Sequence, residues 1–375
     1  MISRLIESIY HFFLTVTHRH FLFILFLIFS LTVMINGLGI ATDTVYFRLA
    51  QNPFRTRLDI AGINYFQESL LMPLLFYSLG ISSLWFYTVA CFGSIAMAQG
   101  LFIATAKQIT ESVSAIILYL ILAIHPVIGV LYTFIGMPDC LTFLLTVMGF
   151  SISSPLLLAV LAFLGTMNHS IAAIALLALT VLRWSSQKEL IGIKQIIAVI
   201  SGVALGRLII WIFFNIYSIA IPATRYDFAK KMTLIDILHN NFSHWPLTLY
   251  SLHGPVWIML LLALYLSWKV DRRYAITAMS VQVVLYGITL FIADTTRVFA
   301  LMAWAPTLHL FYHTLVLVND GRIEDKTHEI RKAFLLVGII GLFAPVYSIW
   351  GGAVHPTNFL NFYQYIASIL VYKIL

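Results

Sequence analysis

Long apolar runs alternate with short polar segments along the whole chain. The long runs cover residues 21–41, 83–105, 113–133, 196–220, 247–268, 275–291, 298–318 and 333–350, and a weaker run covers 359–375. Three shorter runs, 141–150, 156–164 and 171–182, predict compact helices in the middle of the chain. A helix needs roughly 20 apolar residues to cross a bilayer. The pattern therefore predicts an all-α polytopic membrane protein with about ten to twelve transmembrane helices, in a single domain of residues 1–375.

Composition supports this class. The 375 residues are 61% hydrophobic and only 10% charged, which is more apolar than a soluble domain of this size requires. The net charge of +7 is spread over short loops without an aromatic-interleaved basic patch, so no nucleic-acid partner is expected. The only two cysteines, Cys91 and Cys140, lie in or beside apolar runs and are interpreted as small core residues.

Basic residues are distributed unequally between the two sides that these spans define. With the N-terminus inside, 14 of the 22 Lys and Arg lie on the inner side, 7 lie on the other side, and Arg207 falls within a span. Cytoplasmic loops carry an excess of Lys and Arg. This distribution predicts a cytoplasmic N-terminus, and we expect a bacterial inner membrane. The amphipathic residues 1–17 are not expected to be a cleaved signal peptide.

The segment 42–82 is predicted to form the first loop on the far side of the membrane. Asp43, Tyr46 and Ala50 are spaced i, i+3 and i+7, so a helix would present them on one face. Residues 65–79 then predict a short helix that lies along the membrane interface. The alternative is a structured external loop in which Asp43 only caps a helix.

The far side also carries further acidic, histidine and aromatic residues. A second large far-side loop covers 221–246 and contains Arg225. Asp139, His169, Asp294 and Arg297 fall on the same side. Because loops held by a rigid scaffold commonly carry function, we expect a binding vestibule or an active site there.

These features together resemble the integral-membrane glycosyltransferases of the C fold class. The residues that carry the resemblance are TDTVYFRLA around Asp43, Pro53, ESLLMPLLFY from Glu68, and the Pro138–Asp139 turn. The resemblance implies a catalytic acidic residue in the first loop, interfacial helices and a polyprenyl-phosphate sugar as donor. The acceptor would be a lipid-linked molecule, a glycan or a protein on the far side, and membrane lipids surround the site.

Sugar transfer from a lipid phosphate needs a carboxylate that activates the acceptor hydroxyl and a cation that stabilises the departing phosphate. Asp43 is the candidate base, with Glu68 and Asp139 as further catalytic candidates. Arg297, one helical turn after Asp294, and Arg225 are candidates for the phosphate. The alternative for Arg297 is a local i, i+3 salt bridge with a capping Asp294.

The remaining candidates have weaker signals. Tyr46, His169 and His253 are candidate substrate-binding residues, with helix-cap or core roles as alternatives. Arg207 lies mid-span, which suggests function, although Gly202 and Gly206 also allow tight helix packing beside it. No metal site or cofactor is expected, although a divalent cation would be compatible with this chemistry.

Other function classes stay open. A transporter or flippase would use the far-side charges as a gate and would show broken helices in matching halves. A polysaccharide polymerase-like protein would depend on far-side arginines such as Arg225. An assembly subunit without activity is a third alternative. If the transferase prediction is correct, we expect an apolar-walled cleft beside 65–79, with Arg297 or Arg225 pointing into it.

Overall fold

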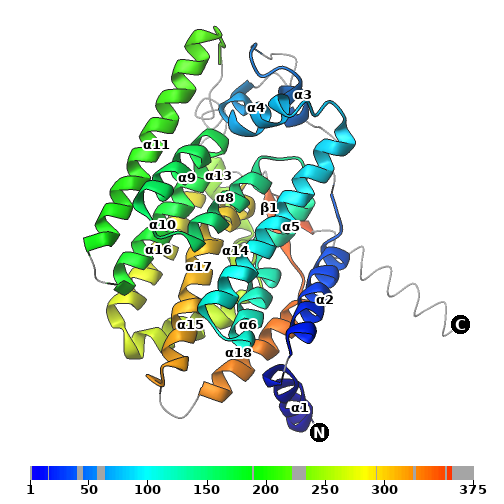
Figure 1. Ribbon diagram of the computed structural model, residues 1–375, viewed down its shortest axis with the longest axis vertical. Helices are drawn as coiled ribbons and strands as arrows, with labels where there is room; N and C mark the ends of the chain where they lie inside the picture. The colour runs from blue at the N-terminus through cyan, green and yellow to red at the C-terminus, as the bar shows by residue number, and fades with distance from the viewer. Residues whose placement is uncertain are drawn as a thin grey trace, which may run out of the picture.

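The computed structural model of the chain describes residues 2–15, 17–39, 45–56, 64–187, 190–221, 234–292, 294–323, 327–350 and 353–356. These residues form an elongated helical bundle (Figure 1). Helix α17 (Thr295–Asn319) runs through its middle, and 83% of the residues in its apolar stretch are buried. Helices α2 (His18–Asn36), α5 (Leu84–Ile109) and α11 (Leu190–Ile216) lie at the edges of the view.

The other helices are mostly shorter and fill the space between and beyond these four. They are α1 (Ile2–Leu14), α3 (Val45–Gln51), α4 (Leu71–Ser78), α6 (Ser112–Ile124), α7 (Pro126–Thr133), α8 (Asp139–Ser151), α9 (Pro155–Asn168), α10 (Ser170–Gln187), α13 (Leu234–Ser243), α14 (Trp245–His253), α15 (Val256–Val270), α16 (Arg272–Thr289), α18 (Thr327–Gly341) and the 3-10 helix η1 (Asn64–Glu68). The strands β1 (Tyr347–Trp350) and β2 (Ala353–Pro356) pair antiparallel.

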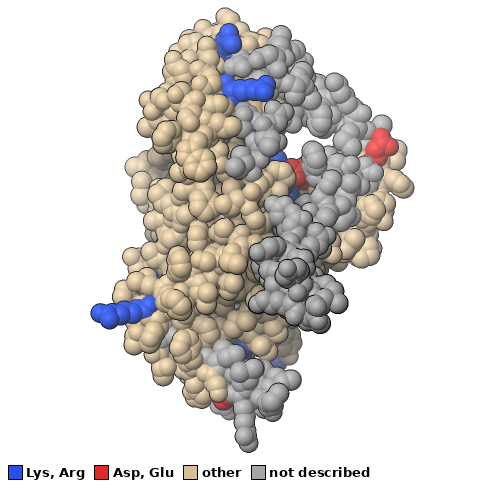
Figure 2. Space-filling view, turned by 90° about the vertical axis from the view of Figure 1, so that its right-hand side faces the viewer, with Lys and Arg blue, Asp and Glu red and all other residues tan. Residues whose placement is uncertain are grey.

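The predicted class is confirmed: this is a helical, multi-pass membrane protein. Helices α2, α5 and α11 expose large apolar side chains on their outer faces, including Phe26, Trp85 and Trp211. Figure 2 shows one face of the molecule, on which the described Lys, Arg, Asp and Glu gather toward the upper end and in the lower third. The broad band between them is almost free of these residues, as contact with the lipid chains of a bilayer requires. Cys91 and Cys140 are buried and free, as expected of core residues.

The number of complete spans differs from the expectation. Among the described residues, four helices are long and apolar enough to cross a membrane, or up to six if each of two bent pairs counts as one span. The predicted compact helices exist as α8, α9 and α10. Their apolar stretches are shorter than a membrane requires, since each residue adds only about 1.5 Å to a helix.

Two runs that were predicted as continuous spans are broken. The span over 113–133 bends by 54° between α6 and α7, where Pro126 begins the second helix and the His125 ring accepts a hydrogen bond from the Val127 N–H. The span over 247–268 bends by 70° between α14 and α15, at Gly254 and Pro255. Gly254 has a positive φ of 55°, which a residue with a Cβ rarely adopts.

The predicted span 333–350 is wrong in its second half. Helix α18 ends at Gly341, and Tyr347–Trp350 form strand β1, which pairs with β2. Pro345 has no N–H for a helical bond, so the helix cannot continue regularly through it. The Ile349 N–H donates to Thr296 Oγ1 at 2.9 Å, which holds β1 against the first turn of α17.

Helix α11 packs closely on α9 through two glycines. A Cβ at Gly202 would lie 2.2 Å from the Ala159 carbonyl oxygen, and one at Gly206 would lie 2.9 Å from that of Phe163. We expect Gly202→Ala to destabilise the protein by about 1–3 kcal/mol through overpacking. Thermal unfolding in detergent measures the effect.

Gly100 on α5 provides the matched control for this prediction. It is also a helical glycine, but a Cβ there would meet nothing within 4 Å. Gly100→Ala should therefore leave stability unchanged or raise it slightly, because alanine is the better helix former. Equal effects of the two substitutions would contradict the close packing of α9 and α11.

Candidate functional site

The described residues of the segment that was predicted to be the first far-side loop lie at one end of the bundle. Helices α3 and α4 sit together at the upper end in Figure 1, close to the end of α11. Tyr46 and Leu49 of α3 are buried, and the Leu70 N–H before α4 donates to the Met167 carbonyl at the end of α9 at 2.7 Å. The loop is therefore packed onto the bundle rather than extended into solvent.

Beneath this loop, Arg297 holds two carboxylates. Its Nε donates to Asp139 Oδ2 at 2.6 Å and its Nη2 to Asp139 Oδ1 at 3.1 Å, a two-pronged contact between α17 and the start of α8. Its Nη1 donates to Asp294 Oδ2 at 3.0 Å. The side chain of Asp139 is 1% exposed, while those of Arg297 and Asp294 are 18% and 21% exposed. We call these three residues the Arg297 cluster.

Neighbouring groups fix the cluster in place. Asp139 is the first residue of α8, where the helix dipole favours a negative charge. Asn168, at the end of α9, donates through Nδ2 to the Pro138 carbonyl at 2.7 Å and to Thr142 Oγ1 at 2.9 Å. The Arg297 guanidinium lies 5.3 Å from the centroid of the Phe134 ring, within range of a cation–π contact.

Burial affects the protonation of Asp294. Burial raises the pKa of the Asp294 carboxyl above its ordinary value, and the nearby Arg297 only partly opposes this effect. The cluster carries two acids and one base, so protonation of Asp294 would make its charges balance. The local salt bridge that the i, i+3 spacing predicted is present, but Arg297 also has a long-range partner that the spacing could not indicate.

The residues on either side of 40–44 are anchored to the bundle. Before them, the Gly39 N–H donates to the Tyr132 carbonyl at 2.8 Å, and the Ile135 N–H donates to the Gly39 carbonyl at 3.2 Å. After them, Tyr46 is 3% exposed and lies close enough to Arg297 to interact with it electrostatically. Asp43, the predicted base, lies outside the described residues, and so does Arg225.

A second charged pair lies in a groove beside the loop. Glu68 of η1 and Arg207 of α11 approach to 3.9 Å, and apolar residues of α11 and the segment after it complete the walls of a groove of about 460 Å³. This matches the apolar cleft expected beside 65–79. Arg297 does not line it, however; Arg207 supplies the cation.

The two candidate histidines are parts of helix ends. His169 lies at the junction of α9 and α10, where its Nδ1 accepts the Ile171 N–H at 3.3 Å, which agrees with the helix-cap alternative. His253 is fully buried at the α14–α15 break, with ring centroids of Trp257 and Phe299 at 4.7 and 5.0 Å.

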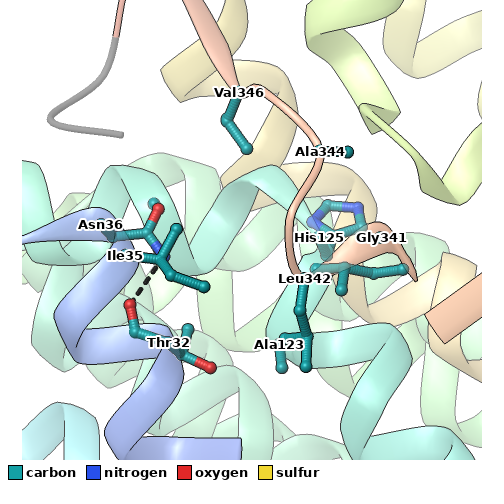
Figure 3. A pocket seen from close by; sticks show the side chains of 11 residues that line it. Thr32, Ile35, Asn36, Ala123, His125, Gly341, Leu342, Ala344 and Val346 are labelled. Carbon is teal, nitrogen blue, oxygen red and sulfur yellow. Dashed lines mark hydrogen bonds between the residues drawn. The ribbon is translucent and has the colours of Figure 1, made fainter. Parts of the chain in front are cut away.

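A small cavity lies beside the break between α6 and α7 (Figure 3). The rings of His125 and His253 are 5.7 Å apart at the two breaks. Beside His125 is a cavity of about 20 Å³, lined also by Thr32 and Asn36, with room for about one water molecule. Asn36 Nδ2 donates to the Thr32 carbonyl at 2.9 Å across its wall.

Metal ligands are not grouped in the described part of the chain. No set of three or more His, Cys, Asp or Glu side chains there could hold a metal ion. His309, one of two histidines spaced i, i+4 on α17, is hydrogen-bonded through Nδ1 to the Tyr274 hydroxyl at 2.8 Å.

The structure therefore brings together Tyr46, Asp139, Asp294 and Arg297 and leaves Glu68, His169 and His253 elsewhere. Sequence reasoning missed Asn168 and Phe134 as supports of the cluster, and it missed Arg207 as the partner of Glu68. An intramembrane arginine was the available signal for Arg207. An asparagine at the end of an apolar helix carried no comparable signal.

Comparison of the chain with known proteins finds no matching family model, no similar curated protein and no similar solved structure. The function must therefore be argued from the geometry of these residues.

Proposed function

We propose that this protein is a membrane glycosyltransferase, which moves a sugar from a polyprenyl-phosphate donor to a glycan, protein or lipid-linked acceptor. The observation that carries the proposal is the convergence of Tyr46, Asp139, Asp294 and Arg297 under the first loop. These residues come from three separate parts of the chain. Burying ionised side chains at the end of a membrane bundle costs desolvation free energy, so such a group is a candidate functional site.

Each group has a role in this proposal. Asp43 takes the proton of the acceptor hydroxyl, and the Arg297 cluster supplies fixed charges to the site. Asp139 acts as a positioning residue rather than a base, because it is nearly inaccessible and both of its oxygens accept from Arg297. Arg225 is the candidate for the donor phosphate, since Arg297 is engaged by two carboxylates.

The proposed function also implies a side of the membrane for the site. The site faces the side of the membrane opposite the N-terminus, with the N-terminus in the cytoplasm of a bacterial cell and the protein in the inner membrane. The two-to-one distribution of Lys and Arg supports this orientation. We assign no cofactor. The transfer assay with and without EDTA measures whether a divalent cation is required.

The experiment is a transfer assay with purified protein in nanodiscs. A panel of radiolabelled polyprenyl-phosphate sugars is offered together with glycan, peptide and lipid-linked acceptors, with and without EDTA. Consumption of the donor, release of polyprenyl phosphate and labelling of the acceptor are measured. We expect turnover of at least one donor by the wild type and loss of turnover in Asp43→Asn. A wild type that binds none of the donors and consumes none would overturn the proposal.

The two broken spans favour a transporter as a second candidate. Their breaks meet at His125 and His253 inside the bundle, and discontinuous helices of this kind form substrate sites in transporters. Uptake of the same labelled lipids, or their transfer between leaflets, in proteoliposomes without chemical conversion would support this candidate over the transferase.

A further inference from the structure

The groove beside the first loop has a charge pair at its polar end. Arg207 Nη1 lies 3.9 Å from Glu68 Oε2, which is an ion-pair distance but too long for a direct hydrogen bond. The Arg207 side chain is 51% exposed, although it lies within the apolar helix α11, and that of Glu68 is 18% exposed. Together the two side chains add no net charge to the groove, so they present a positive and a negative group next to each other.

Apolar side chains and Asn215 form the rest of the wall. Ile210, Trp211 and Phe214 follow Arg207 at i+3, i+4 and i+7, so they share its face of α11, and Ile219 lines the groove beyond the helix. Only 22% of the residues in the apolar stretch of α11 are buried, and the Trp211 side chain is 63% exposed. The groove therefore opens on a helix face that the lipid chains of the membrane contact.

Arg207 lies within the apolar span of α11, so its side chain meets a lipid head group only by extending toward the end of the helix. It lies nine residues before Ile216, the last residue of α11, which places its Cα roughly 14 Å below the helix end at 1.5 Å per residue. A long arginine side chain extends from such a position toward the membrane surface. Its planar guanidinium matches the geometry of a phosphate.

We propose that this groove binds a zwitterionic aminophospholipid, with its phosphate on Arg207, its primary ammonium on Glu68 and an acyl chain along Trp211 and Phe214. Charge complementarity selects this occupant over a purely anionic lipid, because Glu68 would repel an anion held at Arg207. The volume of about 460 Å³ is in the range of small-molecule sites. This site is separate from the Arg297 cluster, and it does not depend on the proposed transferase activity.

Bound lipid would link two elements of the fold. Glu68 belongs to η1 in the first loop, while Arg207 belongs to a membrane helix. A head group held by both residues connects the loop to α11 and keeps η1 beside the bundle. The lipid is thus a structural partner of the loop that is proposed to carry Asp43.

Native mass spectrometry of the full-length protein, after exchange into defined lipids, tests the site without any sugar donor. The probes are phosphatidylethanolamine, phosphatidylcholine and phosphatidylglycerol with identical acyl chains. We expect the wild type to retain phosphatidylethanolamine best. Phosphatidylcholine lacks ammonium protons for Glu68, and phosphatidylglycerol has no ammonium.

Two charge variants distinguish an aminophospholipid site from a simple anion site. Arg207→Gln and Glu68→Gln should each lower retention of phosphatidylethanolamine on the order of tenfold, as expected when one charge-assisted hydrogen bond is lost. Glu68→Gln should at the same time improve retention of phosphatidylglycerol. A wild type that prefers phosphatidylglycerol, together with a Glu68→Gln variant that retains phosphatidylethanolamine better, would overturn the proposal in favour of a simple anion site.

Two further variants test whether a loss of lipid retention reflects misfolding rather than the loss of a specific contact. Trp211→Ala alters an exposed side chain and should weaken retention of all three lipids alike, because it removes apolar wall and no charge. Asp320→Asn, which alters a half-exposed carboxylate outside the groove, should change nothing. Retention that is indifferent to Arg207, Glu68 and Trp211 would show adventitious lipid and would also overturn the proposal.

Discussion

Asp43→Asn is expected to lower the rate of sugar transfer on the order of 10²–10⁴-fold, the usual contribution of a positioned base. The amide keeps the volume of the side chain but cannot accept the acceptor's proton. Folding and donor binding should remain, since the described residues that flank this position, Gly39 and Tyr46, are held by contacts of their own. The transfer assay in nanodiscs and a donor-binding measurement check both parts.

Two comparisons make this result specific. Asp43→Glu should retain some turnover, because the carboxylate survives with altered reach. Asp320→Asn removes a half-exposed carboxylate far along the chain and should leave turnover unchanged. If Asp43 only caps a helix, Asn is an equally good cap and the variant should behave as wild type. That outcome would move the base to Glu68 and weaken the transferase proposal.

Arg297→Gln is expected to destabilise the protein by about 3–5 kcal/mol, because it leaves two carboxylates buried without their cation. Asp139→Asn should cost less, since Asp294 still pairs with Arg297. The double variant should be more stable than the sum of the two single effects predicts, with a coupling of about 0.5–3 kcal/mol. Thermal unfolding in detergent measures all three variants.

The exposed pair of Asp320 and Arg322, 3.9 Å apart, is the matched control for this cycle. Both side chains are at least half exposed, and exposed ion pairs typically contribute about 0–1 kcal/mol. Replacing either should therefore change stability little. Additive effects of Arg297→Gln and Asp139→Asn would contradict a direct contact between these two residues.

The Arg297 cycle and the Asp43 substitution report on different properties. A stable Asp43→Asn variant without turnover points to chemistry, whereas Arg297→Gln is expected to lose stability first and activity as a consequence. Arg297→Lys separates these effects further, because lysine keeps the charge but not the two-pronged contact with Asp139. We expect it to recover part of the stability.

The sequence alone determined the class of this protein and the location of its first loop. Apolar runs and the scarcity of charge are properties of neighbouring residues, so they predicted a helical membrane protein, the compact helices α8, α9 and α10, and a short helix around Tyr46. The i, i+3 spacing likewise predicted the contact between Asp294 and Arg297, because a single helical turn brings such residues together.

Tertiary structure decided the partners that make up the two charged sites. Asp139 and Arg297 are 158 residues apart, and Glu68 and Arg207 belong to a loop helix and a membrane helix. It also decided that two spans bend at Pro126 and at Gly254–Pro255, and that Tyr347–Trp350 and Ala353–Pro356 pair as strands. Hydropathy and helical spacing describe which side of a helix is apolar, but they do not specify which helices pack together. That choice depends on close packing between distant segments, such as α9 on Gly202 of α11, and no local pattern encodes it.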